Sequence, residues 1–340
     1  MSTLKVNTIN AATSGQAVAV DVQNPRSFRN LLINGDCLID QRNGGSSVTS
    51  GYAIDRTQIE GFDGGGTGTG QQVSDGPSGF TKSLKITVTG TDTSLASTDF
   101  YSLRQLIEGQ NVSFLGFGAS GGTSVTLSFW VKSSVTGTFS CSIGNGDNDR
   151  SYPKTYTISS ANTWEKKTLT FPAATDGTWG TDNGRGIAVR WSLGGGSGRL
   201  GTADQWNSSQ AHGATGTTNL FATNGATFFI TGLQLEAGSV ATDFEHRSYG
   251  DELARCQRYY YKKPINTNGP PAYQYHNNHK QSVVFFPTIM RAIPTCVATW
   301  GQGTFTHYYH SASHFKAYIG SAYDSASSYY LTSLTATAEL

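Results

Sequence analysis

Histidine and tyrosine side chains gather in the last quarter of this 340-residue chain. Five of the seven histidines lie there, interleaved with tyrosines: His276, His279, His307, His310 and His314 among Tyr273, Tyr275, Tyr308 and Tyr309. Neutral imidazoles are the commonest metal ligands, whereas aromatic faces beside hydrogen-bonding side chains suit the C–H faces and hydroxyls of sugars. Histidines also pack in ordinary interfaces. The sequence leaves three interpretations open: a metal site, a glycan-binding surface, or interface packing.

The histidine spacing disfavours the metal site. His276 and His279 are three residues apart, as are His307 and His310, and residues three apart in one strand point to opposite faces. We therefore expect no metal ion and no other cofactor. The residues that we predict to bind a receptor or glycan are Tyr273, Tyr275, His276, His307, Tyr308 and Tyr309.

No constellation typical of an enzyme is visible. The sequence contains no His-Glu-x-x-His run, which would indicate a metalloprotease. A glycosidase needs only two suitably spaced carboxylates, and Asp55, Glu60, Asp99 and Glu108 are available. Structural roles are the simpler interpretation, so we expect no catalytic residues and no enzymatic activity. The glycine-rich run 61–70 lacks the Lys-Ser/Thr ending of a phosphate loop and is predicted as a mobile loop.

Composition favours β-structure and argues against nucleic acid and membranes as partners. Charged residues make up 14% of the chain, 41 residues are glycine, and the formal net charge is +1. This balance gives no electrostatic reason to expect nucleic acid. No run approaches the ~20 apolar residues of a membrane span, so we expect no membrane insertion. The four cysteines are far apart and share no metal-ligand spacing, which favours reduced thiols and synthesis in a cytoplasm.

Period-two alternation of apolar residues recurs between Phe28 and Phe244. Such alternation is typical of antiparallel strands with one buried face. The segments predicted as strands are 31–33, 84–88, 103–107, 125–131, 139–143, 156–158, 169–171, 187–193 and 229–235. Their number and spacing predict an all-β fold, an antiparallel β-sandwich of jelly-roll type. We expect Trp164, Trp179 and Trp206 in the core or at the rim of this sandwich.

A short capped helix is predicted after the sandwich. Ser248 and Asp251 have the spacing of a capping box, and Arg255 lies towards the other end, where the helix dipole favours cations. About ten residues make a helix that is marginal alone and needs packing. We predict that it packs near the threefold axis of a trimer, through Leu253, Cys256, Gln257 and Tyr260.

The chain divides into four predicted segments. These are an N-terminal arm at 1–27, the jelly-roll sandwich at 28–247, the helix and linker at 248–263, and a small β-domain at 264–340. Strands of the last domain are predicted at 283–286, 296–300, 305–309, 315–319 and 329–334. A domain of this size with many aromatic residues benefits from burial in an oligomer.

Several segments resemble modules of bacteriophage tail fibre and tail-associated virion proteins. The opening of the sandwich module is matched by 30–36, 39–43 and 52–56, its middle by 128–133 and 164–169, and its end by 228–262. The middle is also similar in outline to carbohydrate-binding jelly rolls. Segments 1–6, 286–295 and 335–340 resemble the start and the C-terminal module of such fibres. Two positions depart from the pattern: Thr57 replaces a common Trp, and Asp243 replaces a common Pro.

The resemblance implies a homotrimeric virion fibre. Its N-terminal arm would attach to a tail or adaptor protein, and its distal end would bind a host surface polysaccharide without cleaving it. Two other functions stay open. The chain could be a purely structural baseplate, adaptor or head-fibre component, or a glycan depolymerase with carboxylates between subunits. The resemblance carries no receptor-binding residues over to this sequence.

Overall fold

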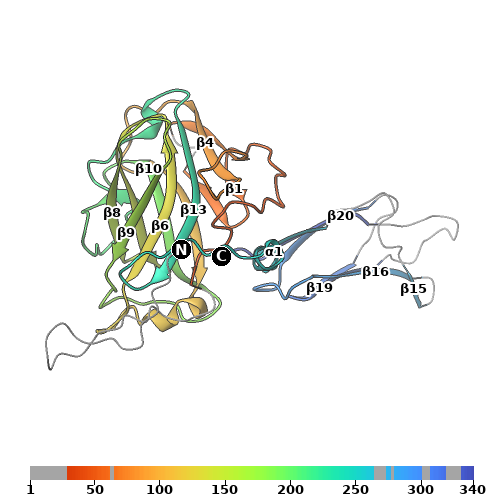
Figure 1. The fold of residues 1–340 in the computed structure, drawn as a ribbon. Helices are drawn as coiled ribbons and strands as arrows, with labels where there is room; N and C mark the ends of the chain where they lie inside the picture. The colour runs from red at the N-terminus through yellow and green to blue at the C-terminus, as the bar shows by residue number, and fades with distance from the viewer. Residues whose placement is uncertain (1–28, 62–64, 264–272, 277–278, 301–306, 319–330) are drawn as a thin grey trace, which may run out of the picture.

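The computed structural model describes residues 29–61, 65–263, 273–276, 279–300, 307–318 and 331–340. For 273–276, 279–280 and 307–308 it describes the backbone alone. A large β-sandwich carries a slender C-terminal unit that projects from one side, and α1 lies between the two (Figure 1). The predicted arm at 1–27 lies outside the described residues. No helix in the described part of the chain is long and apolar enough to cross a membrane.

Two antiparallel sheets form the sandwich, which confirms the predicted all-β jelly-roll fold class. One sheet has the order β1-β2-β5-β10-β7-β8 and the other β3-β4-β13-β6-β9. The strands are β1 Gly51–Ile54, β2 Thr57–Glu60, β3 Thr67–Val73, β4 Ser83–Gly90, β5 Phe100–Glu108, β6 Val125–Ser133, β7 Gly137–Asn145, β8 Ser151–Ile158, β9 Glu165–Phe171, β10 Arg185–Gly195 and β13 Thr227–Ala237. Three short 3-10 helices, η1 Gly109–Asn111, η2 Ser113–Leu115 and η3 Leu220–Ala222, connect them.

The core between the sheets follows the alternation read from the sequence. In β6, Val125, Leu127, Phe129 and Val131 are fully buried. Phe129 meets Trp191 of the opposite sheet edge to face, with ring centroids 6.2 Å apart. Burial of these apolar side chains is the main force that holds the two layers together.

Two local predictions were wrong. The predicted strand at 31–33 is a turn region, in which Leu31 N donates to Leu235 O and the backbone of Ile33 pairs with the side chain of Gln105 (2.7 and 2.9 Å). Part of the predicted mobile loop at 61–70 is instead β3. Its glycines allow a neighbour to approach: a Cβ on Gly70 would lie 2.6 Å from Ile59 Cδ1.

An excursion between β10 and η3 lies against the outer face of the six-stranded sheet. It contains the short parallel pair β11 Leu200–Gly201 and β12 Gly213–Ala214. Ser142 Oγ donates to Ala211 O (2.8 Å), and Ala214 N donates to Ser140 Oγ (2.9 Å). The excursion therefore covers β7 and the adjoining part of β10, and it defines one border of the exposed sheet surface.

Helix α1, Tyr249–Gln257, has the predicted cap: Ser248 Oγ accepts from Asp251 N (3.2 Å). Two of the four residues predicted to pack across a trimer are already buried within this chain. Cys256 is fully buried. Tyr260 is also buried, and the guanidinium of Arg42 stacks on its ring, 3.6 Å from the ring centroid of Tyr260. Leu253 and Gln257 are half-buried. Packing near a threefold axis stays a prediction, and it now depends on Leu253 and Gln257.

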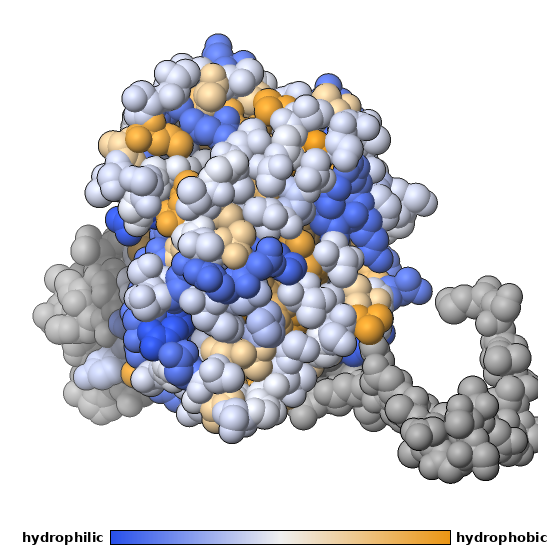
Figure 2. All heavy atoms as spheres, turned by 90° about the vertical axis from the view of Figure 1, so that its left-hand side faces the viewer, coloured by the Kyte–Doolittle hydropathy of each residue, from blue (hydrophilic) through white to orange (hydrophobic). Residues whose placement is uncertain are grey.

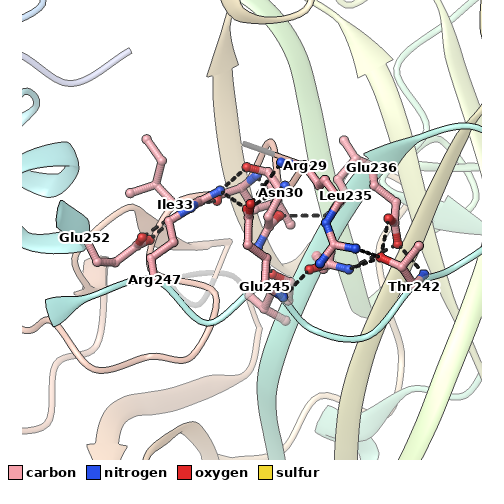
Figure 3. Close-up of polar contacts among 12 residues, drawn as sticks. Arg29, Asn30, Ile33, Leu235, Glu236, Thr242, Glu245, Arg247 and Glu252 are labelled. Carbon is pink, nitrogen blue, oxygen red and sulfur yellow. Dashed lines mark hydrogen bonds and ion pairs between the residues drawn. The ribbon is translucent and has the colours of Figure 1, made fainter. Parts of the chain in front are cut away.

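A polar network ties the first described residues to β13 and α1 (Figure 3). The Glu245 carboxylate accepts from Arg29 N and Asn30 N (3.1 and 2.9 Å). Arg247 lies between Glu245 and Glu252, at 2.9 and 3.1 Å from their carboxylates. The Asn30 side chain accepts from Leu235 N (3.1 Å) and donates to the backbone of β13. This network gives structural roles to Asn30, Glu245, Arg247 and Glu252.

The C-terminal unit is a second, smaller sandwich. Its three-stranded sheet has the order β14-β20-β17 and its four-stranded sheet β15-β16-β19-β18. The strands are β14 Tyr260–Lys263, β15 Tyr273–His276, β16 His279–Phe285, β17 Thr295–Trp300, β18 His307–His310, β19 His314–Tyr318 and β20 Leu331–Thr337. Residues 260–263, predicted as linker, are thus hydrogen-bonded to β20. The core of this unit contains Val284, Phe286, Met290, Phe315, Ala317, Leu331, Leu334 and Ala336.

Buried ion pairs join the two sandwiches. Arg56 is almost fully buried, stacks 3.4 Å from the ring centroid of Tyr259, and forms an ion pair with Glu339. Arg258 binds both carboxylate oxygens of Glu108 at 2.8 Å. Bidentate guanidinium–carboxylate pairs fix orientation as well as distance. The C-terminal unit is therefore held in a defined direction on the large sandwich.

Candidate functional site

The outer surface of the four-stranded sheet is the strongest candidate site in the C-terminal unit. Alternation in β16 and β19 buries Val284, Phe315 and Ala317 and turns the residues between them outwards. We call this outer surface the tip face. Its described side chains are Gln281, Val283, Phe285, Tyr309, His314, Lys316 and Tyr318.

Aromatic rings and polar groups alternate on the tip face. Tyr309 is 68% exposed, and its ring meets that of Tyr318 edge to face with centroids 6.2 Å apart. The Lys316 ammonium lies 5.2 Å from the Tyr318 ring centroid. Phe285 is 74% exposed, and its ring lies 6.0 Å from the imidazole of His314. Exposed rings beside an ammonium and an imidazole can stack on a sugar ring and hydrogen-bond its hydroxyls.

The backbone register brings two of the predicted residues into one row. His307 pairs with Tyr318, Tyr318 with Gln281, and Gln281 with Tyr273. Three strand spacings separate Tyr273 from His307, which places their backbones roughly 14 Å apart. The predicted residues therefore lie at both edges of one sheet rather than in a single cluster.

The remaining predicted residues occupy different positions. Tyr309 lies on the tip face opposite Lys316, whereas Tyr308 is opposite Ala317, whose side chain is buried. Tyr275 falls where the register of the β15–β16 hairpin shifts. Tyr309 is the predicted residue whose described side chain lies on the tip face.

The reasoning from histidine spacing was wrong for one pair. His276 ends β15 and His279 begins β16, so the two residues are cross-strand partners rather than members of one strand. His307 and His310 do belong to one strand, β18. Among the residues that the structure describes, no group of three or more His, Cys, Asp or Glu side chains is placed to hold a metal ion.

Sequence reasoning missed the middle of the tip face. Phe285, Lys316 and Tyr318 fill it, between the edge strands that carry the predicted residues. The signal was present as period-two patterns, Gln281-x-Val283-x-Phe285 and His314-x-Lys316-x-Tyr318. The predicted strands at 283–286 and 315–319 contain part of these patterns but begin after Gln281 and His314.

The four available carboxylates each have structural partners. Glu108 binds Arg258 and accepts from Tyr259 OH (2.5 Å); burial raises its pKa, but these partners lower it below its ordinary value. Glu60 forms ion pairs with two arginines. Asp99 accepts from Ala96 N (2.8 Å), and Asp55 accepts from the Gln41 side chain (2.5 Å).

The three tryptophans considered from the sequence are half-buried, as expected for a rim position. Trp164 donates to Asp75 (3.3 Å), and Trp179 meets Trp206 edge to face with centroids 5.6 Å apart. Figure 2 views the sandwich from the side of β8 and β9, where the surface is mostly pale and blue with small, scattered apolar spots. This side of the sandwich shows no broad apolar patch.

Comparison with known proteins gives structural similarities only. No protein family model matches the sequence. A search of curated proteins also finds no match. We therefore take the function from this chain's own side chains.

Several solved structures are similar to part of the chain. The enzymatically active domain of tailspike protein 4 from bacteriophage CBA120 has a TM-score of 0.32 and 14% identity, over 61% of this chain and 21% of that one. A carbohydrate-binding module named CBM4 has a TM-score of 0.30 and 14% identity, over 54% of this chain and 94% of that one. The family 11 carbohydrate-binding module of Lic26A-Cel5E from Clostridium thermocellum has a TM-score of 0.30 and 13% identity, over 61% and 99%.

Proposed function

We propose that this chain is a subunit of a phage fibre that binds a host surface glycan through the tip face, without cleaving it. The observation that carries the proposal is the exposed Tyr309 ring beside Tyr318 and Lys316, on a sheet whose other side buries Val284, Phe315 and Ala317. Large exposed rings contribute much of the energy at binding surfaces. On the tip face they are held in place by the sheet and not by a loop.

The rigid connection to the large sandwich supports this role. Arg56, Glu339, Arg258 and Glu108 fix the direction in which the C-terminal unit projects. A fibre needs such a direction because several copies must present their sites to one surface together. Linked sites on one rigid assembly raise avidity without any new contact.

Exposed aliphatic side chains support assembly with further copies of the chain. Ile289, Ile293 and Val297 are 67%, 68% and 62% exposed. Val297 lies on β17, in the other sheet of the C-terminal unit, and is therefore separate from the tip face, whereas Ile289 and Ile293 lie in the segment between β16 and β17. Burial of such side chains in a homotrimer would remove apolar surface from water. The N-terminal arm would then bind the tail or adaptor protein of the virion.

The proposal of binding without cleavage rests on the ion pairs and the burial of the candidate catalytic carboxylates. Glu60 and Glu108 are held by guanidinium groups, and Asp55 is buried under the side chain of Gln41. General acid and base roles in glycoside hydrolysis require two carboxyl groups that face the substrate. Within the described residues, these carboxylates serve the packing of the sandwich.

Two tyrosine substitutions test the proposal. Tyr309→Ala is expected to weaken binding to purified host envelope polysaccharide about 10-fold or more, because it removes an exposed stacking ring. Tyr249→Ala is the matched control, since Tyr249 is 61% exposed but lies on α1 outside the tip face. Biolayer interferometry with immobilised polysaccharide measures both affinities.

Three results would count against the proposal. Equal affinities of the Tyr309→Ala and Tyr249→Ala variants would remove the tip face from recognition. Shortened sugar chains after incubation, seen by size-exclusion chromatography, would show a depolymerase. A single-chain mass by light scattering at micromolar concentration would contradict the homotrimer.

A further inference from the structure

Arginine side chains are crowded on the outer face of the six-stranded sheet. Arg104 of β5 and Arg190 of β10 are direct cross-strand partners, and Gln58 of β2 is the partner of Arg104 on the other side. They face outwards because their strand neighbours Leu103 and Val189 belong to the core between the sheets. Like charges placed directly opposite each other destabilise a sheet. An arrangement of this kind therefore needs a compensating negative charge.

The described contacts supply one carboxylate to this cluster. Glu60 lies 2.6 Å from Arg104 Nη1 and 3.2 Å from Arg190 Nε. A third guanidinium, that of Arg185, is near enough that its pKa is lowered by burial and by Arg104 and raised by Glu60. Arg104 and Arg190 thus share one carboxylate. Arg185 is the cross-strand partner of Glu108, which lies on the same face of β5 as Arg104, so the Arg185 side chain belongs to the same outer face.

Two hydrogen-bond donors of the cluster are unused. Arg190 Nη2 and Arg104 Nε are buried and have no hydrogen-bond partner among the described residues. The Arg190 side chain is only 1% exposed. Burial, together with Arg104 and Arg185, lowers the pKa of Arg190 to about 10, although Glu60 opposes this. A buried charged donor without a partner is costly, and an incoming anion would remove that cost.

The cluster lies between two covered regions of the sheet. The excursion that carries β12 packs over β7, and Arg258 and Tyr259 cover Glu108 at the end of β5. Between them, Gln58, Glu60, Arg104 and Arg185 are half-buried and reach the surface. Guanidinium groups are well suited to this position because their planar donors match carboxylate, sulfate and phosphate oxygens.

We propose that the cluster of Arg104, Arg185 and Arg190 binds an anionic group, a carboxylate, sulfate or phosphate, on the sandwich and apart from the tip face. The anion completes the charge balance that Glu60 leaves unfinished. Its source is either a free inorganic anion or the acidic group of a polysaccharide. The second source rests on the proposed function, and the first does not.

Arg185→Gln gives the cleanest test, because no ion pair or hydrogen bond of the Arg185 guanidinium is recorded among the described contacts. Binding of sodium sulfate and sodium glucuronate to the full chain is measured by isothermal titration calorimetry, at ionic strength kept constant with sodium chloride. Affinity is expected to fall about 10-fold or more in the variant. Arg150→Gln is the matched control, since Arg150 pairs with exposed Asp176 outside the cluster and should leave affinity unchanged.

Stability without ligand gives a second readout that distinguishes binding from a structural role. Removal of Arg185 relieves its repulsion by Arg104, so the ion-free variant should have an unchanged or higher unfolding midpoint. A lower midpoint in the ion-free variant would instead assign Arg185 to the packing of the sheet and overturn the proposal. Equal affinities of the native chain and the Arg185→Gln variant would show an adventitious ion only and would overturn the proposal. The absence of any sulfate or glucuronate binding would overturn it too.

The source of the anion is tested with polymers. Retention of the native chain on polygalacturonate but not on dextran, lost in Arg185→Gln, would support an acidic polysaccharide. Sulfate binding through Arg185 without retention on polygalacturonate would support a free-anion site and overturn the polysaccharide source. Neither result depends on Tyr309, so failure of the tip-face proposal stays separate from failure of this one.

Discussion

Asp55 shows how burial changes the chemistry of a single side chain. It is 1% exposed, and one of its carboxyl oxygens has no hydrogen-bond partner among the described residues. Burial raises its pKa from 3.8 to about 7, although the hydrogen bond from Gln41 opposes the shift. The protonated, neutral form is therefore favoured in the folded chain under mildly acidic conditions.

This shift predicts the sign of a pH effect on stability. Between about pH 4 and pH 7 the folded chain keeps a proton on Asp55 that the unfolded chain has lost, so the contribution of Asp55 to the free energy of unfolding falls as pH rises through that window. Asp55→Asn should remove this slope, and its stability relative to the native chain should increase from pH 4.5 to pH 8. Urea unfolding at several pH values measures the difference. The control Asp147→Asn changes an exposed carboxylate and should leave the pH dependence of stability unchanged. If the free energy of unfolding of Asp55→Asn and that of the native chain changed equally with pH, the prediction would be wrong.

At the scale of single elements, α1 combines local and distant interactions. Its cap is local, since Ser248 and Asp251 are three residues apart and bond to each other. Its attachment is distant, since Glu252 accepts from Asn34 N, and these two residues are 218 positions apart in the sequence. A helix of nine residues is too short to be stable alone, so both kinds of contact are needed.

Removal of the cap has a predictable cost. Ser248→Ala leaves Asp251 N without its acceptor and should lower the free energy of unfolding by about 1 kcal/mol. Guanidinium-induced unfolding followed by circular dichroism measures this change. Ser239→Ala is the control, because Ser239 is exposed and lies outside any helix. A variant as stable as the native chain would show that the distant contacts alone hold α1.

The whole molecule depends on ion pairs between its two sandwiches. Glu339 binds both Arg42 and Arg56, and the three side chains are 8%, 15% and 2% exposed. Because these charges are buried, loss of one partner leaves the other without compensation. The direction in which the tip face points therefore depends on a residue next to the end of the chain.

Neutralisation of Glu339 tests this connection. Glu339→Gln should lower the free energy of unfolding by about 3 kcal/mol, the range expected for breaking a buried pair, and should make the C-terminal unit susceptible to proteolysis before the large sandwich. Asp176→Asn, which breaks the exposed pair with Arg150, should have a much smaller effect, because solvent screens that pair. Similar losses in the two variants, measured by urea unfolding and limited proteolysis, would contradict a buried, orienting role for Glu339.

The sequence by itself determined the fold class and several elements. Alternation such as Val125, Leu127, Phe129 and Val131 predicts a strand with one buried face, because side chains in a strand point to opposite sides in turn. The cap of α1 was predictable for a similar reason, since its donor and acceptor are neighbours in the chain. Interactions between residues that are close in the sequence can therefore be predicted from the local sequence pattern.

The tertiary structure alone decided which distant residues meet. Gly70 of β3 packs against Ile59 of the opposite sheet so closely that a Cβ would lie 2.6 Å from Ile59 Cδ1. The Arg104–Arg190 pair and the row from Tyr273 to His307 follow from sheet register, which joins strands far apart in the sequence. Register depends on the packing of both layers at once, so no local pattern could specify these sites.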